Sequence, residues 1–236
     1  MVTRIPLTEV AAALCIGDRS HIALVGGGGK TTLLHALGDH LAGRVVLTTT
    51  TKMGIAEHRG RPVLLDPSDV EVVAATSSGP AMVWRRIGGD KAIGVEPARC
   101  DAWFDVVDHV VVEADGSRGR PFKAPTDHEP VIPKTATLVV HVMGVDALGR
   151  VIADQCHRPL RVAALAACRA DRRLDPFMAA RVIVHRRGVR RSVPADAEHA
   201  VVITKVDEGT ALLADELADE LRDRDPTLRI IAVAAR

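Results

Sequence analysis

The sequence predicts an α/β protein built on a doubly wound, mostly parallel sheet in three layers, with an elaborated edge. Three observations predict this architecture. Short runs of β-branched residues recur along the chain, segments of helical periodicity separate many of them, and a glycine-rich stretch links the first of these runs to a helix. Alternation of strands and helices is typical of parallel sheets joined by right-handed crossovers.

The predicted strands are apolar runs bounded by charged or turn-forming residues. Several are apolar throughout instead of alternating, which is typical of parallel strands buried on both faces. The runs are HIALV (21–25), RVVLT (44–48), RPVLL (61–65), HVVVE (109–113), TLVVHVM (137–143), RVIVH (181–185), AVVIT (200–204) and RIIAV (229–233).

Helices are predicted where leucines recur with a period near 3.6 residues. Four leucines between residues 33 and 41 share one stripe, and Gly43 ends that helix. Four more, between residues 212 and 221, repeat the pattern near the C-terminus. Residues 1–20 contain a short apolar run that carries Glu9, which predicts an amphipathic helix and not a signal peptide.

The middle of the chain is less regular. Glycine- and proline-rich punctuation in residues 54–108 predicts an elaboration of the sheet edge, with a hairpin through AMVW and KAIGV. Residues 144–199 carry helices and the basic run HRRGVRR (185–191), interpreted as a solvated loop. We expect residues 1–236 to form a single nucleotide-binding domain with insertions around 54–108 and 144–199.

Composition excludes several functional classes. The 31 Lys and Arg residues nearly balance 30 Asp and Glu residues, so the formal net charge is +1 and no global field favours nucleic acid or membranes. Aromatic residues make up only 2%, which argues against base-stacking platforms. The four cysteines form no CxxC pair, and no apolar run reaches the ~18 residues of a spanning helix. A small-molecule partner and a cytoplasmic location are expected.

The stretch HIALVGGGGKTTLLHALGDHLAG (21–43) carries the strongest chemical signal. A strand that runs into glycines, then Lys-Thr and a helix, lets backbone N–H groups converge on phosphate oxygens. Lys30 would reach the β- and γ-phosphates, and the Thr31 hydroxyl would bind Mg²⁺. The predicted nucleotide-binding residues are Gly26, Gly27, Gly28, Gly29, Lys30, Thr31 and Thr32. The match to G-x-x-x-x-G-K-[ST] is imperfect, because Leu24 stands where the first glycine belongs.

The stretch VVVEADGSRGRPFK places Glu113 and Asp115 at the carboxyl end of a strand, where ligands of open α/β sheets bind. We expect one carboxylate to hold Mg²⁺ through water and the other to orient a nucleophile or substrate. Both are therefore candidate metal and catalytic residues, together with Lys30. An acidic pair at this position can also be a simple helix cap.

The stretch VVITKVD ends in Thr204-Lys205-Val206-Asp207, which matches the [NT]-K-x-D element. In that element the aspartate accepts hydrogen bonds from guanine, whereas adenine would leave it poorly satisfied. Lys205 and Asp207 are therefore predicted to contact the base, and GTP is favoured over ATP.

The stretch LTTTTKM (47–53) ends the strand that follows the phosphate helix. β-propensity alone explains Thr48. The following residues emerge where a γ-phosphate would lie, so Thr49 and Thr50 are predicted nucleotide contacts and Lys52 a substrate contact.

Together, GGGGKTT, TTTTKM, VEADGSRGRPFKAPTDHEPVIP, GVDALGRVI, HRP and TKVD resemble the YqeC family, named as selenium-dependent hydroxylase (molybdenum cofactor) accessory proteins. The resemblance covers nearly the whole chain. It implies a P-loop NTPase-like fold, a homodimer as the frequent form, Mg²⁺ with GTP or ATP as cofactors, and a role in maturing molybdenum hydroxylases. The hydroxylase or its cofactor-maturation machinery would then be the protein partner.

The same block suggests a substrate surface beside the Mg²⁺ carboxylates. A cationic cluster there could supply an arginine finger, for which Arg118 is the catalytic candidate, or hold an anionic partner such as a pterin phosphate. Alternatively, its arginines pair with surface carboxylates and its histidines are structural. The substrate-binding candidates are Lys52, Arg120, Lys123, His128, His157 and Arg158, with Glu129 nearby.

Three functions remain open at this point. The leading one is a Mg²⁺-dependent nucleotide hydrolase, favoured as a GTPase, coupled to cofactor maturation. The second is a small-molecule kinase or nucleotidyltransferase acting on a pterin-like acceptor. The third is a maturation chaperone that binds without turnover.

Overall fold

The main sheet has nine strands, and every neighbouring pair in it is parallel. The computed structural model describes residues 1–235. Across the sheet the strands are β1 (Arg4–Ile5), β14 (Arg229–Ala234), β13 (Glu198–Val206), β11 (Leu138–Gly144), β2 (Ser20–Gly26), β9 (His109–Glu113), β3 (Val45–Thr49), β6 (Ala81–Trp84) and β5 (Val63–Leu65). The predicted doubly wound α/β sheet is confirmed at this level.

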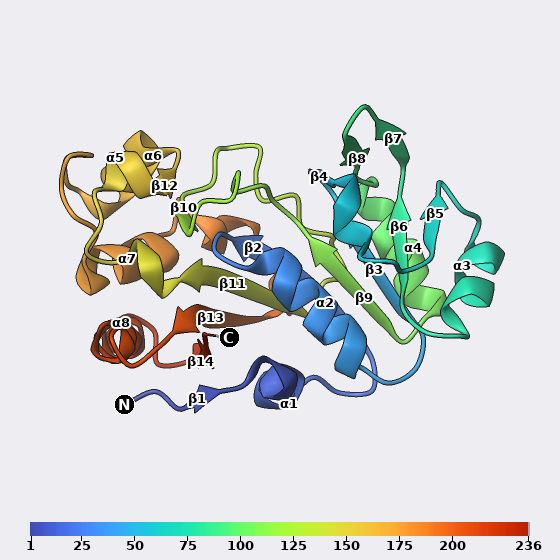
Figure 1. Cartoon of the computed structure of the whole chain (residues 1–236), viewed down its shortest axis with the longest axis horizontal. Coiled ribbons are helices and arrows are strands. Elements are labelled where there is room, and N and C mark those ends of the chain that lie inside the picture. Colours follow the sequence, from blue (N-terminus) through green and yellow to red (C-terminus); the bar gives the residue numbers. More distant parts are fainter. Residues whose placement is uncertain (236) are drawn as a thin grey trace.

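Helices cover both faces, because alternate residues of each strand point to opposite sides. On β2, Ile22 and Leu24 pack with the leucines of α2 (Lys30–His40). Their neighbours Ala23 and Val25 pack with Trp103 and Val72 on the opposite face. Figure 1 shows α2 crossing in front of the sheet. The remaining helices are α1 (Val10–Ala13), α3 (Asp69–Thr76), α4 (Pro97–Val106), α5 (Ile152–Gln155), α6 (Pro159–Ala166), α7 (Pro176–Ile183) and α8 (Ala211–Arg224).

The chain reverses its direction of winding around β2. After β2 it builds β3, β5 and β6 on one side, returns to β9 beside β2, and then adds β11, β13 and β14 on the other side. The carboxyl ends of β2 and β9 therefore open at a switch point of the sheet, where open α/β proteins bind ligands. The glycine-rich stretch, Glu113 and Asp115 lie at this point.

Two small sheets stand at this same edge. One is antiparallel, in the order β4 (Lys52–Gly54), β8 (Lys91–Ile93) and β7 (Arg86–Gly88), and the other pairs β10 (Phe122–Lys123) with β12 (Cys156–His157). The predicted hairpin through AMVW and KAIGV is corrected: AMVW is the parallel strand β6, and the hairpin is β7–β8. Val83 lies in a fully buried strand, which suits the main sheet better than an exposed hairpin.

Residues 181–185, predicted as a strand, belong largely to helix α7. Asp175 Oδ1 accepts a hydrogen bond from the Met178 N–H at 2.7 Å, and Pro176 occupies the first turn. This cap starts a helix whose buried residues include Ala180 and Ile183, packed in the same core cluster as α8. Packing therefore overrides the strand propensity of the Val-Ile-Val run.

The predicted N-terminal helix is shorter than expected. Residues Arg4–Ile5 form edge strand β1 against Ala232 and Val233, and helical structure begins only with η1 (Leu7–Glu9) and α1. Pro6 separates the strand from the helical part, since its ring fixes φ and removes a donor. In α8, Leu212 is 76% exposed, so the buried stripe begins at Leu213.

The four arginines of the basic run (185–191) are exposed, as predicted for a solvated segment, but two of them also pair with other parts of the protein. Arg190 pairs with Asp225, and Arg191 donates to the Glu129 carbonyl at 2.9 Å and pairs with Asp127 at 3.1 Å. These contacts hold η4 (Val189–Ser192) against the segment that follows β10. Within residues 1–235, all four cysteines carry free thiols and no helix has the length and apolarity that crossing a bilayer requires.

Candidate functional site

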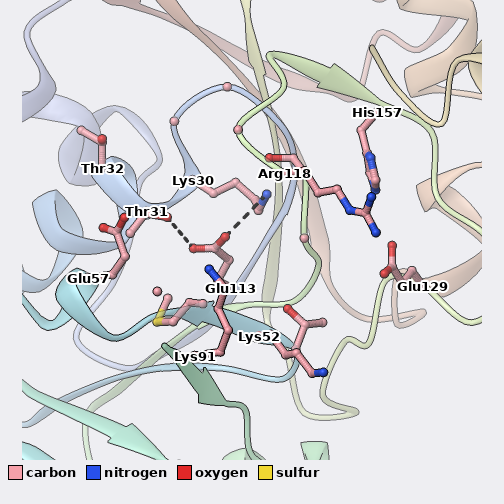
Figure 2. A pocket seen from close by; sticks show the side chains of 18 of the residues that line it. Lys30, Thr31, Thr32, Lys52, Glu57, Lys91, Glu113, Arg118, Glu129 and His157 are labelled. Carbon is pink, nitrogen blue, oxygen red and sulfur yellow. Dashed lines mark hydrogen bonds and ion pairs between the residues drawn. The ribbon is translucent and has the colours of Figure 1, made fainter. Parts of the chain in front are cut away.

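A cavity of about 930 Å³ lies at the carboxyl edge of the main sheet. It is lined by the glycine-rich loop, the start of α2, the end of β9, the loop after it, β12 and the small sheet β4–β8. Figure 2 shows Lys30 and Glu113 facing each other inside it, with Arg118 and His157 on one side and Thr32 and Glu57 on the other. Its lining side chains include seven Lys or Arg residues against three Glu residues. This excess of positive charge favours an anionic ligand.

The first three glycines pack against neighbouring backbone. A Cβ on Gly26 would lie 2.3 Å from the Val142 carbonyl oxygen, and one on Gly28 would lie 2.2 Å from the Gly144 nitrogen. Their N–H groups are also engaged, since Gly26 donates to Asp115, Gly27 to Val142 and Gly28 to Arg120. These N–H groups fix the loop to the sheet in this structure, and phosphate binding by residues 26–28 stays a prediction.

The backbone N–H groups without a protein acceptor belong to the next residues of the chain, 29–32. Within residues 1–235, the N–H groups of Gly29, Lys30, Thr31 and Thr32 donate to no protein acceptor, and the first helical bond of α2 runs from Leu33 to Gly29. Unpaired N–H groups at a helix N-terminus, reinforced by the helix dipole, form an anion site. Gly28, Gly29 and residues 30–32 line the cavity, whereas Gly26 and Gly27 do not.

Lys30 is held deep in the site by two carboxylates. Its ammonium is 3.2 Å from Asp115 Oδ1 and 3.7 Å from Glu113 Oε1, and it donates to the Gly26 carbonyl at 2.7 Å. The residue is 3% exposed and Asp115 is fully buried. Burial raises the pKa of Glu113, while the nearby Lys30 charge acts in the opposite direction. The lysine therefore faces the cavity from a position in which its charge is already matched.

Asp115 anchors the loop and does not border the cavity. Its two oxygens accept from the Gly26 N–H at 3.1 and 3.0 Å, and Lys123 lies 3.1 Å from Oδ2. Both carboxylate oxygens are thus engaged by protein groups, which gives Asp115 a structural role in the loop. The role of Asp115 as a Mg²⁺ ligand stays a prediction.

Lys123 extends the charge network to the far wall. Its ammonium also donates a hydrogen bond to Glu129 Oε2 at 2.8 Å, and the Arg158 guanidinium donates to the same oxygen at 2.6 Å. Burial opposes ionisation of Glu129, but the hydrogen bonds from Arg158 and Lys123 prevail and lower its pKa to about 2. Three cations, Lys30, Lys123 and Arg158, thus balance the three carboxylates.

Thr31 and Glu113 fit a small divalent cation. The Thr31 hydroxyl donates to Glu113 Oε2 at 2.8 Å, close to the ~2.9 Å between adjacent oxygen ligands of an octahedral Mg²⁺ bound at about 2.0–2.1 Å. Within residues 1–235 there is no cluster of three His, Cys, Asp or Glu residues that could hold a metal alone. Two protein oxygens suit Mg²⁺, which commonly takes its other ligands from water and phosphate.

Of the threonines at the end of β3 and just after it, some bond to neighbouring backbone and one lines the cavity. Thr49 donates to the Glu113 carbonyl at 2.8 Å and Thr50 to the Val131 carbonyl at 2.8 Å, so both support structure. Thr51 and Lys52 line the cavity instead. The hydroxyls of Thr49 and Thr50 point into neighbouring backbone, and their contact with a nucleotide stays a prediction.

The TKVD element reaches the cavity only in part. Lys205 lines it and pairs with Asp146 at 2.6 Å, while Thr204 donates to the Gly28 and Met143 carbonyls. Asp207 Oδ1 accepts from the N–H and hydroxyl of Thr210, at 2.9 and 2.7 Å, and Asp207 lies outside the lining. Asp207 is thus placed as a turn cap beside the site.

The predicted substrate-binding residues fall into two groups, those that line the cavity and those that do not. Lys52, Arg118, His157 and Arg158 line the cavity, and burial together with Arg158 lowers the pKa of His157 to about 4. Arg120, Lys123 and His128 do not line it: Arg120 donates to the Asp154 carbonyl, Lys123 is buried in ion pairs, and His128 is exposed. Sequence reasoning missed Lys91, which β8 brings to the site, and Glu57 and Arg59, which the turn after β4 brings there.

Two comparisons with known proteins indicate the same family. The family model described as YqeC protein matches residues 22–160. A protein described as "Uncharacterized protein YqeC", from Escherichia coli (strain K12), is 33% identical over 214 residues, which cover 86% of this chain and 83% of that protein. No solved structure matches the chain significantly. The family match includes the loop, Glu113 and Arg158, and it ends before the TKVD element.

Proposed function

The chain belongs to the YqeC protein family, and from the geometry of its cavity we propose that it binds Mg²⁺ with GTP or ATP and hydrolyses the nucleotide. A P-loop NTPase-like use of the parallel sheet is part of this proposal. The observation that carries it is the meeting of free amides, a lysine and a Mg²⁺-type oxygen pair at the start of α2.

The triphosphate would lie across residues 28–32. The four unpaired N–H groups and the helix dipole would hold phosphate oxygens. Lys30 would exchange its contact with Asp115 for the β- and γ-phosphates, and Asp115 would keep a cationic partner in Lys123. The network therefore lets Lys30 leave without stranding a buried carboxylate, which is otherwise costly.

Thr31 and Glu113 would hold Mg²⁺ between the protein and the phosphates. When bound, the ion would neutralise charge that develops on the phosphate oxygens. Arg118 is exposed, lines the cavity, and has no carboxylate within ion-pair distance among residues 1–235. It is the side chain best placed to stabilise additional negative charge in the transition state.

We propose that the nucleotide base lies on the β13 side of the cavity. Lys205 borders the cavity there and supports GTP as the first nucleotide to test, following the TKVD pattern. The position of Asp207 as a turn cap weakens that preference relative to ATP, because its Oδ1 is already engaged.

The cellular role rests on the family resemblance alone. On that ground we place the nucleotide cycle in the maturation of molybdenum-cofactor hydroxylases, including selenium-dependent ones. Deleting the gene should lower the activity of such a hydroxylase without lowering the amount of its polypeptide. Unchanged hydroxylase activity in the deletion strain would contradict this role while leaving the nucleotide chemistry standing.

The binding proposal is tested by titration calorimetry with GTP and ATP, with and without Mg²⁺. Lys30→Ala should weaken Mg²⁺-dependent binding roughly 10- to 100-fold, the loss expected for one charge-assisted hydrogen bond. Lys134→Ala is the matched control, because Lys134 is an exposed lysine outside the cavity. Absence of Mg²⁺-dependent binding in the wild type, or equal binding by both variants, would reject the proposal. Tight binding without phosphate release would favour the non-hydrolysing chaperone.

A further inference from the structure

The small sheet β4–β8 forms one wall of the cavity, through Lys52, Met53, Gly54 and Lys91. Met53 pairs with Ala92 and both are buried, and Met53 also borders the cavity. Because side chains alternate along a strand, Lys52 and Lys91 project from the face opposite to Met53 and bring two cations to this wall. Arg59, just after η2 (Ile55–His58), lies on the same wall.

These cations are available to a ligand. Lys52 has no carboxylate within ion-pair distance among residues 1–235. Lys91 lies 3.5 Å from Asp90 and Arg59 3.9 Å from Glu57, but these side chains are exposed by 41% or more. Exposed pairs of this kind contribute little and are easily exchanged for a better anion.

The wall is rigidly attached to the proposed phosphate site. Gly94, directly after β8, donates to the Thr51 carbonyl at 2.6 Å, and Val95 donates to the Thr49 carbonyl at 2.9 Å. Thr49 in turn donates to the Glu113 carbonyl at 2.8 Å. A Cβ on Gly94 would lie 2.3 Å from the Thr49 carbonyl oxygen, so only glycine allows this close approach. The backbone positions of Lys52 and Lys91 relative to Glu113 are therefore fixed before any ligand arrives.

The cavity extends beyond one triphosphate on both sides. Its lining runs from Lys205 on β13, past the loop after β2, to the strands that follow β3. Crossing from β13 to β3 spans about 19 Å at the usual separation of neighbouring strands. In the proposed binding mode the phosphates would occupy the middle and the nucleoside the β13 side, which would leave the small-sheet side open. Figure 2 shows Lys52 and Lys91 on the side of Glu113 away from Lys30.

We infer that Lys52, Arg59 and Lys91 bind a second, anionic small molecule, bearing phosphate or carboxylate groups, opposite the nucleotide's terminal phosphate. This inference rests on the proposed nucleotide site and adds the class of its second substrate. Lysine and arginine recognise both kinds of oxyanion, and three of them on one wall suit a group of charge near −2.

The test uses the full-length protein saturated with Mg²⁺ and a non-hydrolysable GTP or ATP analogue. Inorganic phosphate and malonate are then titrated separately by calorimetry at constant ionic strength, so that the two oxyanion classes are distinguished. Lys91→Gln and Lys52→Gln should each weaken binding of the preferred anion roughly 10-fold or more. Affinity for the analogue should stay within about 2-fold of wild type.

Arg86→Gln is the matched control, because Arg86 is an exposed cation of the same small sheet outside the cavity. Anion binding that survives in Arg86→Gln and is lost in Lys91→Gln supports the inference. No anion binding to the loaded protein, or equal losses in all three variants, overturns it while nucleotide binding stands. If no nucleotide binds, the proposed function fails, and the same titrations on unloaded protein decide the inference by the same criterion.

Discussion

At the scale of single residues, the site is organised by charge matching in a buried environment. Lys30, Lys123 and Arg158 compensate Glu113, Asp115 and Glu129. Buried ion pairs add little net stability, but removal of one partner leaves an uncompensated charge. The network therefore specifies the position of the loop more than it stabilises the fold.

Lys123 provides a direct test of this view. Lys123→Met should lower the free energy of unfolding by about 3–5 kcal/mol, because Asp115 and Glu129 would lose a buried cation. Lys205→Met is the comparison, since the Lys205–Asp146 pair is about half exposed and should be worth less than about 1 kcal/mol. Urea unfolding measures both, and equal losses would show that burial of the network has no energetic consequence.

Thr31 tests the cation site. Thr31→Val keeps the side-chain shape but removes the hydroxyl that lies 2.8 Å from Glu113, so Mg²⁺ should no longer strengthen nucleotide binding. Thr31→Ser restores the hydroxyl and should restore the effect. Binding is measured at increasing Mg²⁺ with nucleotide held constant. Retention of the Mg²⁺ effect in Thr31→Val would remove Thr31 from the cation site.

The grouping of side chains around the loop could be predicted, because the local sequence determines which of them lie together. A strand, glycines and Lys30-Thr31 at the start of a helix place these groups together by geometry, and Glu113 follows from the end of a neighbouring strand. The ion pair between Asp115 and Lys123 could not be predicted, because it depends on how the loop between β9 and β10 folds back on itself. Lys91 was missed for a similar reason.

At the scale of elements, the glycine-rich loop packs tightly against the sheet, in addition to its proposed role in binding an anion. Gly26, Gly27 and Gly28 pass so close to neighbouring backbone that any side chain would collide. The loop is thereby held against β11 and residues 120–122, which fixes the N-terminus of α2 above the switch point of the sheet.

A comparison of two glycines with the same φ separates the cost of steric overlap from the cost of a left-handed backbone conformation. Gly28 and Gly149 both have φ of +73°, but a Cβ on Gly28 would lie 2.2 Å from the Gly144 nitrogen, whereas one on Gly149 would meet nothing within 4 Å. Gly149→Ala should cost about 1–2 kcal/mol of unfolding free energy from the left-handed conformation alone. Gly28→Ala should cost about 1–3 kcal/mol more from overpacking. Equal losses in urea unfolding would show that the loop relaxes freely.

Elements were predictable where burial and periodicity agreed. The runs at 109–113 and 137–143 became β9 and β11 because they are apolar on both faces, as a central parallel strand requires. The run at 181–185 became helical because a cap at Asp175 and burial against α8 outweigh strand propensity. The small sheet could not be ordered from sequence, since its three strands have three residues each.

At the scale of the whole molecule, one parallel sheet aligns all functional segments at a single edge. Glu113 of β9, Lys205 of β13 and the segments that directly follow β2 and β3 reach the cavity, because parallel strands end on the same side. The fold class follows from the alternation of elements, whereas the strand order does not, because alternation leaves the side on which each crossover returns undetermined.

The sheet also buries several histidines in their neutral form, which makes the stability of the whole molecule depend on pH. Burial lowers the pKa of His21 and of His199 to about 4 and that of His141 to about 3. In the unfolded chain these residues gain protons as pH falls below about 6.5, whereas the folded protein does not take them up until about pH 4. Unfolding is therefore favoured increasingly between these limits.

The size of this effect follows from proton counting. Near pH 5 these three histidines give the unfolded state about three extra protons. Three protons correspond to a loss of about 4 kcal/mol per pH unit, and the raised pKa of Glu113 acts in the opposite direction. Urea unfolding at pH values from about 7 to about 5 measures the slope. His199→Phe should reduce it by about 1.4 kcal/mol per pH unit, since one titrating group is removed. A stability independent of pH over this range would mean that these histidines are hydrated in the folded protein, in conflict with their burial in the sheet.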